Sequence, residues 1–111
     1  MSSSSTATIR YADLVDSVAA ALQYISYYHP ADYIQHLARA YEREQSAAAK
    51  DAIAQILTNS RMCAEGKRPI CQDTGIVNVF LKIGMDVRWG DFPGSIQDAI
   101  NEGVQIGRAH V

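Results

Sequence analysis

The stretch Pro69-Ile-Cys-Gln-Asp-Thr-Gly75, followed by Ile76-Val-Asn-Val-Phe-Leu-Lys-Ile83, is where the chain changes from a helical to a strand-like pattern. Its first part brings a thiol, an amide, a carboxylate and a hydroxyl together at consecutive positions, closed by a glycine. Its second part largely alternates in side-chain character, which is the two-residue period of a β-strand. Such a cluster at the entrance to a strand predicts a site where Cys71 holds a metal centre, and where Gln72 and Asp73 face a small polar substrate.

Upstream of this stretch, apolar residues recur at spacings of three and four, which is the period of one α-helix face. Pro30 separates the first helix from the second, because proline disfavours helix at the residue before it. Ser46 is expected to cap the start of the third helix, and Gly66 is expected to end that helix in the left-handed conformation. The three predicted helices cover about residues 11–27, 31–44 and 47–66.

Downstream of the predicted strand, Gly84 precedes a second alternating segment, Met85–Trp89, which predicts a returning strand and therefore a β-hairpin. Ser95 is expected to cap a final helix. The predicted fold class is thus α+β, with three N-terminal helices, a β-hairpin and a C-terminal helix over residues 11–111, after a disordered Ser-rich tail over residues 1–10. A lone hairpin is only marginally stable, so we expect these elements to be part of a larger enzyme domain.

The 111 residues allow one domain at most, and a composition of 48% hydrophobic and 20% charged residues is typical of a soluble globular protein. A net charge of −2 disfavours a nucleic-acid partner, which would need a basic face. No apolar run reaches the length of a membrane span, and the Ser-rich start lacks the features of a secretory signal. We therefore expect a cytoplasmic protein with reduced cysteines and no membrane partner.

The two cysteines, Cys63 and Cys71, lie eight positions apart and have no nearby pair of histidines, so they do not form a zinc site. Cys63 lies inside the third predicted helix and is expected to be a buried structural thiol, which is the commonest state of a cysteine. The same explanation is open for Cys71, but a turn between helix and strand offers backbone N–H groups that favour a thiolate. If Cys71 binds a metal, the other ligands must come from elsewhere.

Asp73-Thr74-Gly75 has two further explanations. It is a good turn sequence, because Asp accepts local backbone hydrogen bonds and Gly permits positive φ. It is also the active-site signature of aspartic proteases, whose retroviral-type members are dimers of chains about this long and carry an Ile-Gly-Arg segment, as Ile106-Gly-Arg108 does here. Those proteases are nearly all β, whereas the sequence before Pro69 predicts helix, so this alternative ranks last.

A small basic cluster, formed by Arg61, Lys67 and Arg68, lies beside the motif. Positive charge suits the C-terminal end of a helix, and it also attracts an anionic substrate; the sequence leaves both explanations open. The three histidines show no mutual ligand spacing, so each is expected on the surface or between helices.

Several segments closely resemble the N-terminal part of class I fumarate hydratases, the iron–sulfur fumarases, and in particular their bacterial branch. The resemblance covers nearly the whole chain beyond the tail, and its central motif is far more specific than a lone Asp-Thr-Gly. The segments that carry it are Pro69–Gly75 with Val79-Phe80, Ala21–Pro30, Ala52–Gly66 and Gly84–Trp89.

The resemblance implies an enzyme of the tricarboxylic acid cycle that interconverts fumarate and L-malate. Such enzymes carry a 4Fe-4S cluster held by three cysteines, which leaves one iron open to act as a Lewis acid on a substrate oxygen. Cys71 would be the first of these ligands. Gln72, Asp73 and Thr74 match positions that line the substrate pocket, with Asp73 the candidate for proton transfer or for orienting the substrate hydroxyl. Thr74 and Gly75 would shape the turn.

The family's enzymes are much longer and are dimers, with the other two cluster cysteines in sequence that follows this part. We therefore expect an N-terminal fragment of a homodimeric enzyme, with no cluster and no hydratase activity of its own. Two alternatives stay open. Related iron–sulfur hydro-lyases act on L-tartrate, sometimes as separate subunits, and a non-catalytic helical module could use the Cys71 loop merely as a turn.

Overall fold

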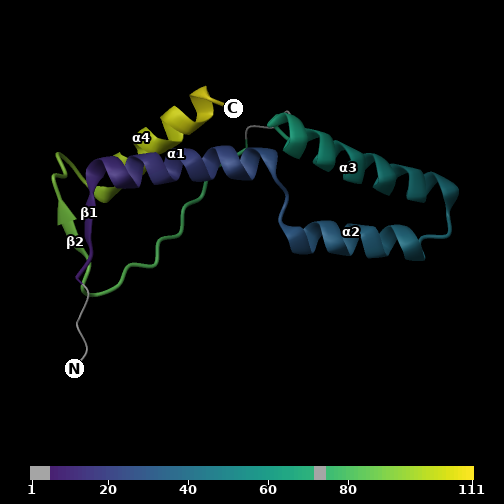
Figure 1. The fold of residues 1–111 in the computed structure, drawn as a ribbon, viewed down its shortest axis with the longest axis horizontal. Helices are drawn as coiled ribbons and strands as arrows, with labels where there is room; N and C mark the ends of the chain where they lie inside the picture. Colours follow the sequence, from purple (N-terminus) through teal and green to yellow (C-terminus); the bar gives the residue numbers. More distant parts are fainter. Residues whose placement is uncertain (1–5, 72–74) are drawn as a thin grey trace. The chain divides into compact units, whose positions relative to one another are not determined.

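A computed structural model describes residues 6–71 and 75–111 of the chain (Figure 1). Contacts divide these residues into two compact units: one holds the residues up to Gln23 and those from 75 to 110, and the other holds Tyr24 to Cys71 and Val111. Helix α1 contributes to both. The elements in chain order are β1 (Thr8–Arg10), α1 (Tyr11–Tyr27), α2 (Ala31–Arg43), α3 (Ala47–Gly66), β2 (Arg88–Gly90) and α4 (Ile96–Ala109). The predicted helices are therefore confirmed, and the predicted β-hairpin is wrong.

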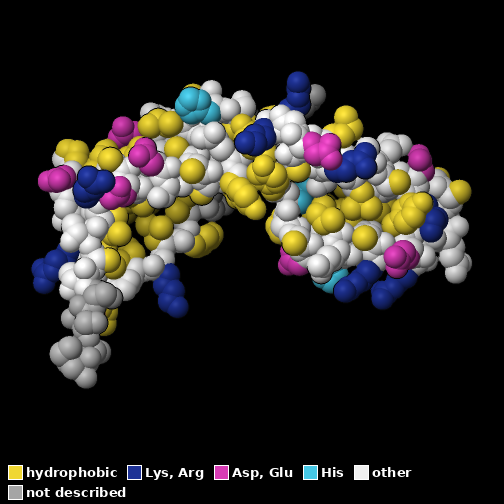
Figure 2. All heavy atoms as spheres, in the orientation of Figure 1, with side chains coloured by type: hydrophobic (Ala, Val, Ile, Leu, Met, Phe, Trp, Pro, Cys, Tyr) yellow, Lys and Arg dark blue, Asp and Glu magenta, His cyan; other side chains and the backbone are white. Residues whose placement is uncertain are grey.

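In the unit that begins at Tyr24, α2 and α3 form a helical hairpin and lie side by side (Figure 1). Figure 2 shows hydrophobic side chains gathered along the line where the two helices meet. Ser46 caps α3 as predicted, because its side chain accepts a hydrogen bond from the backbone N–H of Ala49. The Lys50 ammonium donates to the carbonyl of Tyr41 at 2.7 Å, which ties the start of α3 to the end of α2.

The C-terminal end of α3 differs from the prediction by one residue. Lys67, not Gly66, adopts the left-handed conformation, with φ 51° and ψ 56°. The backbone N–H of Arg68 then donates to the carbonyl of Cys63 at 3.0 Å, which satisfies one of the helix's terminal carbonyls. Pro69 follows immediately and prevents the helix from continuing. Left-handed geometry costs a non-glycine residue free energy, so Lys67 is a slightly strained position.

In the other unit, α4 packs against α1 through small residues. Ala99, Gly103 and Gly107 are buried, and Ala99 is fully inaccessible. A Cβ atom at Gly103 would lie 2.7 Å from Cβ of Val18 and 2.8 Å from the backbone oxygen of Val15. The two backbones therefore approach more closely than any side chain at position 103 would allow. Ser95 caps α4 as predicted and shares a reciprocal capping box with Asp98.

Two exposed polar contacts involve residues at the start of α1 in this unit. The Tyr11 hydroxyl donates to the carboxylate of Glu102, which raises the pKa of Tyr11 above its ordinary value, mainly because of that hydrogen bond. The Arg10 guanidinium lies 3.2 Å from the Asp13 carboxylate, and this contact lowers the pKa of Asp13. The aromatic rings of Tyr11 and Phe92 meet edge to face at 5.4 Å, so the Tyr11 side chain has a polar contact at its hydroxyl and an aromatic contact at its ring.

The strands differ most from the sequence prediction. β1 and β2 pair in parallel, with Thr8 opposite Arg88 and Arg10 opposite Gly90. Thr8–Arg10 belongs to the segment expected to be a disordered tail, yet it forms one of the two strands found in the described residues. A turn does form after Gly84, whose carbonyl accepts from the backbone N–H of Val87. The segment before that turn, however, has no strand assignment, because alternation specifies which face a strand buries and not which segment it pairs with.

No helix in the described part of the chain combines the length and the apolar character that crossing a membrane requires.

Candidate active site

The backbone that leads into Cys71 is held on both sides. The N–H of Ile70 donates to the carbonyl of Ser26 at 2.9 Å, and the Ile70 carbonyl accepts from Nδ2 of Asn59 at 3.1 Å. These partners come from the end of α1 and the second half of α3. Cys71, the next residue, has an exposed side chain. The fold thus presents this thiol from a fixed piece of backbone.

Cys63 is a different kind of thiol. It is buried on α3, with an exposed fraction of 7%. Its Sγ lies 3.4 Å from the carbonyl oxygen of Pro69 and 3.6 Å from Oδ1 of Asn59. The sulfur therefore lies near two acceptors, and its single thiol hydrogen can be donated to only one of them at a time. The predicted structural role of Cys63 is confirmed, and neither cysteine is part of a disulfide.

Three of the predicted site residues, Gln72, Asp73 and Thr74, lie outside the described residues, so their roles stay predictions. Gly75 is described and has a φ of +57°. A Cβ atom there would meet no atom within 4 Å, so backbone conformation rather than space favours glycine. This agrees with the turn-forming role expected of Gly75.

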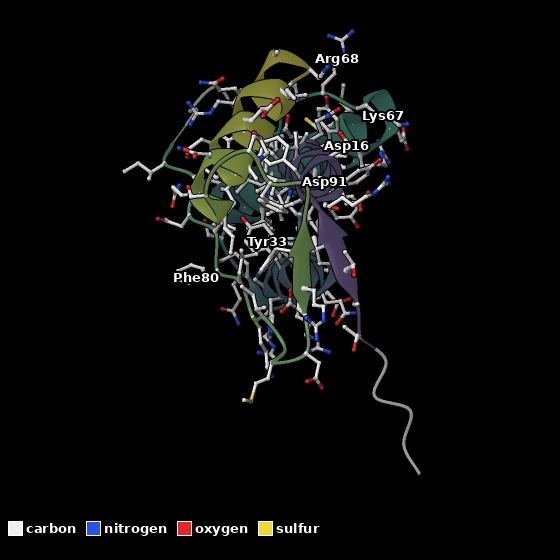
Figure 3. All side chains as sticks on the ribbon, turned by 90° about the vertical axis from the view of Figure 1, so that its left-hand side faces the viewer. Asp16, Tyr33, Lys67, Arg68, Phe80 and Asp91 are labelled. Carbon is white, nitrogen blue, oxygen red and sulfur yellow. The ribbon has the colours of Figure 1, made fainter. Side chains whose placement is uncertain are left out.

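The basic cluster is exposed at the end of α3. Arg61 lies 4.0 Å from the carboxylate of Glu65, a solvent-exposed ion pair of little energetic weight. Lys67 and Arg68 form no ion pair with any residue that the structure describes. Figure 3 labels both side chains at this end of the helix, with Arg68 pointing away from the ribbon. Two exposed cations that have no ion-pair partner among the described residues contribute a positive potential next to Cys71, and such a potential attracts a small anion.

A shallow groove of about 460 Å³ lies in the same unit. At this groove Nδ1 of His29 lies 2.9 Å from Oγ of Ser60, so His29 has the interhelical location that was expected. Its ring also stacks obliquely on Tyr33, with centroids 4.9 Å apart. The residues that line the groove include His29, Tyr33, Gln55, Ile56, Asn59 and Ile70.

The described residues do not fit a metal cluster by themselves. No group of three or more His, Cys, Asp or Glu side chains gathers anywhere in residues 6–71 and 75–111. Cys71 can supply one thiolate, whereas Cys63 is buried and already engaged. Since these are the chain's two cysteines, a cluster held by three thiolates would need two from other polypeptide.

Sequence reasoning missed Asn59 and Ser26, the residues that hold Ile70. The signal for Asn59 was weak but present, because asparagine is a poor helix former in the interior of a helix. A polar residue at that position predicts that its side chain bonds to something other than the helix itself. No comparable signal marks Ser26, which acts through its backbone carbonyl.

Comparison with known proteins agrees with the motif. A family model described as fumarate hydratase (fumerase) matches residues 15–110. A protein of Methanocaldococcus jannaschii named "Putative L(+)-tartrate dehydratase subunit alpha" is 37% identical over 78 residues, which are 70% of this chain. The chain spans 27% of the length of that curated relative. No solved structure matches the chain.

Proposed function

This chain belongs to the fumarate hydratase family of class I iron–sulfur hydro-lyases, and we propose that it supplies the Cys71 loop of an enzyme that hydrates fumarate reversibly to L-malate. Residues 11–111 are then the N-terminal part of that enzyme's domain. The observation that carries the proposal is the exposed Cys71 thiol, which directly follows a residue whose backbone is hydrogen-bonded on both sides.

In this proposal each residue of the loop has a distinct task. Cys71 donates one thiolate to a 4Fe-4S cluster, which supplies a Lewis-acidic iron when it is bound. Asp73 holds or moves the proton that hydration adds to the substrate and dehydration removes from it, or it orients the substrate hydroxyl. Gln72 and Thr74 donate hydrogen bonds to the substrate. The remaining two thiolates come from polypeptide other than these 111 residues, so the isolated chain is expected to be inactive.

The substrate is a small dicarboxylate. Its two negative charges suit the exposed cations of Lys67 and Arg68, which lie within four residues of Cys71. Electrostatic attraction of this kind raises the rate of encounter more than the strength of binding, so neutralising both cations is expected to raise KM with little change in kcat.

L-Tartrate is the second candidate substrate, and the 37% identity to a protein named as a tartrate dehydratase subunit supports it. That relative's name includes the word subunit, so an arrangement with a second type of chain is the corresponding alternative to a homodimer. Fumarate is preferred because the motif and three further segments of the chain resemble the iron–sulfur fumarases.

The test uses the complete protein that carries this chain, purified without oxygen and assayed with both substrates. We expect fumarate hydration in the wild type, and its loss in Asp73→Asn with the iron content unchanged. Gln55→Ala is the matched control, because Gln55 lies on the same unit and bonds to Asp51 rather than to the loop. Turnover of L-tartrate without fumarate hydration would move the assignment to the second candidate.

Two other classes are less well supported. Retroviral-type proteases are nearly all β, whereas most residues described here are helical. In a non-catalytic interaction module, Asp73→Asn should have little effect. Full turnover of the complete protein with that substitution would therefore count against a catalytic role of Asp73.

A further inference from the structure

We propose that Asn59 is a positioning residue for Cys71: its side-chain amide, together with the Cys63 thiol, clamps the backbone before Cys71 onto α3. The value of this clamp to catalysis rests on the proposed function. The clamp itself does not, because every contact that forms it lies between described residues of one unit.

The Asn59 amide is used at both of its ends. Nδ2 donates to the carbonyl of Ile70 at 3.1 Å, and Oδ1 faces Sγ of Cys63 at 3.6 Å. The Ile70 carbonyl oxygen can only accept, so this neighbour fixes which way the amide points. The Cys63 sulfur does not fix it, because a thiol can donate to an oxygen or accept weakly from an N–H. With the amide reversed, two oxygens would face each other at the Ile70 end. The amide orientation is therefore specified by its surroundings.

Three consecutive residues before Cys71 are held by their backbone groups. Arg68 donates its N–H to the carbonyl of Cys63 at 3.0 Å. Pro69 has no N–H, and its carbonyl accepts from the Cys63 thiol at 3.4 Å. Ile70 uses both of its groups, through Ser26 and Asn59. Within this set, Asn59 supplies a side-chain donor to the backbone, and it does so at the residue adjacent to Cys71.

A metal ligand benefits from such support. Functional constellations must be held within about 0.5 Å of the productive geometry, and partners behind the ligand provide that precision. An exposed thiol on a loose turn would sample many positions. Clamping the preceding peptide removes that freedom while leaving the sulfur accessible, which is the combination that the structure has at Cys71.

The experiment measures the loop directly on the 111-residue chain. Amide hydrogen exchange of Ile70 is followed by NMR, and alkylation of Cys71 by iodoacetamide is followed by mass spectrometry of the Cys71 peptide. Asn59→Asp keeps the shape of the side chain but removes the Nδ2 donor. We expect Ile70 exchange to quicken at least about tenfold and Cys71 alkylation to change with it, while amides in the first half of α3 keep the wild-type rates.

Three further variants make the result specific. Asn59→Gln keeps an amide donor and is expected to restore part of the Ile70 protection. Asn59→Ala removes the donor without harming α3, because alanine is the best helix former, so it replaces Asn59→Asp if that variant fails to fold. Gln55→Ala, which removes a groove-lining amide one turn away, is expected to behave as wild type.

Ile70 exchange and Cys71 alkylation that stay within about twofold of wild type in a folded Asn59→Ala chain would overturn the clamp. A change spread evenly over all amides of α3 would also overturn it, because that is the signature of a purely structural asparagine. Neither measurement needs iron or substrate. Failure here therefore leaves the hydro-lyase assignment standing, whereas failure of the complete protein to hydrate either substrate leaves the clamp standing.

Discussion

Helix α3 and the segment 76–83 carry equally clear sequence patterns, yet only the helix forms as predicted. A helix makes its backbone hydrogen bonds within itself, so capping by Ser46 and a favourable sequence suffice. A strand makes them with another segment, and in the described part of the chain the segment 76–83 has no strand assignment. Most of its apolar side chains are accordingly exposed: 88% for Ile76 and 93% for Phe80, whose ring projects from the ribbon in Figure 3. The difference teaches that pattern predicts local structure and leaves pairing open.

The largest effect on stability is expected where α4 packs most closely against α1. Gly103→Val places side-chain atoms where a Cβ would already lie 2.7 Å from Val18, so we expect a loss of about 3 kcal/mol in the free energy of unfolding. Urea denaturation followed by circular dichroism measures it. Gly66→Ala is the matched control, because its nearest neighbour is 3.6 Å away on the exposed side chain of Arg68, and a change below about 1 kcal/mol is expected. Equal losses in both variants would contradict close packing of α4 on α1.

A smaller effect, a gain in stability, is expected at the C-terminal end of α3. Lys67→Gly removes the cost of left-handed geometry from a side-chain-bearing residue and should stabilise the chain by up to about 1 kcal/mol. Lys67→Ala keeps that cost and should give no gain. Thermal unfolding of the two variants side by side distinguishes them, and equal melting temperatures would show that Lys67 is not left-handed in solution.

The contact between Tyr11 and Glu102 predicts a pH dependence at the α1–α4 contact. Because the pKa of Tyr11 is raised above its ordinary 10.0, its contribution to stability is complete below about pH 10 and is lost as the pH rises through the higher folded-state value. The difference in Tm between wild type and Tyr11→Phe should therefore shrink above pH 10. A difference that stays constant from pH 8 to the alkaline limit would argue against the hydrogen bond. Tyr33→Phe serves as the control for general effects of losing a hydroxyl.

The smallest effect on folding is expected in the segment 76–83. Phe80→Ser should change the free energy of unfolding by less than about 0.5 kcal/mol, because the ring is already exposed. It should nevertheless weaken self-association, which exposed apolar side chains promote, and sedimentation velocity over a range of concentrations measures this. The contrasting variant Val15→Ala, at a buried position, should cost about 2 kcal/mol. A large loss of stability in Phe80→Ser would mean that this segment is packed after all.

The parts of the fold that the sequence could predict are those decided by neighbours in the chain. Helix bounds followed from apolar spacing, and the caps at Ser46 and Ser95 followed from residue type. The parallel pairing of Thr8–Arg10 with Arg88–Gly90 could not be predicted, because it joins segments far apart in sequence and neither carries a long strand pattern. The left-handed residue is Lys67 rather than Gly66, because glycine adopts that conformation readily but does not require it.

The candidate site also has features that the sequence could predict and features that it could not. Cys63 is buried, as its place inside a helix predicted, and Cys71 is exposed. The metal-binding role that the motif predicts for Cys71 stays a prediction. The hydrogen bond from Asn59 to the Ile70 carbonyl could not be predicted. The two residues are eleven positions apart, and the bond forms only because the loop folds back on α3. Gln72, Asp73 and Thr74 keep the roles that the family resemblance implies for them as predictions.

The most direct measurement is the iron and sulfide content of the complete protein, purified without oxygen, in the variants Cys71→Ser and Cys63→Ser. We expect Cys63→Ser to retain a 4Fe-4S cluster and fumarate hydration, because the Cys63 sulfur serves the loop and not the metal. We expect Cys71→Ser to lose both. A Cys71→Ser protein that keeps its cluster and its turnover would contradict the central role of this loop.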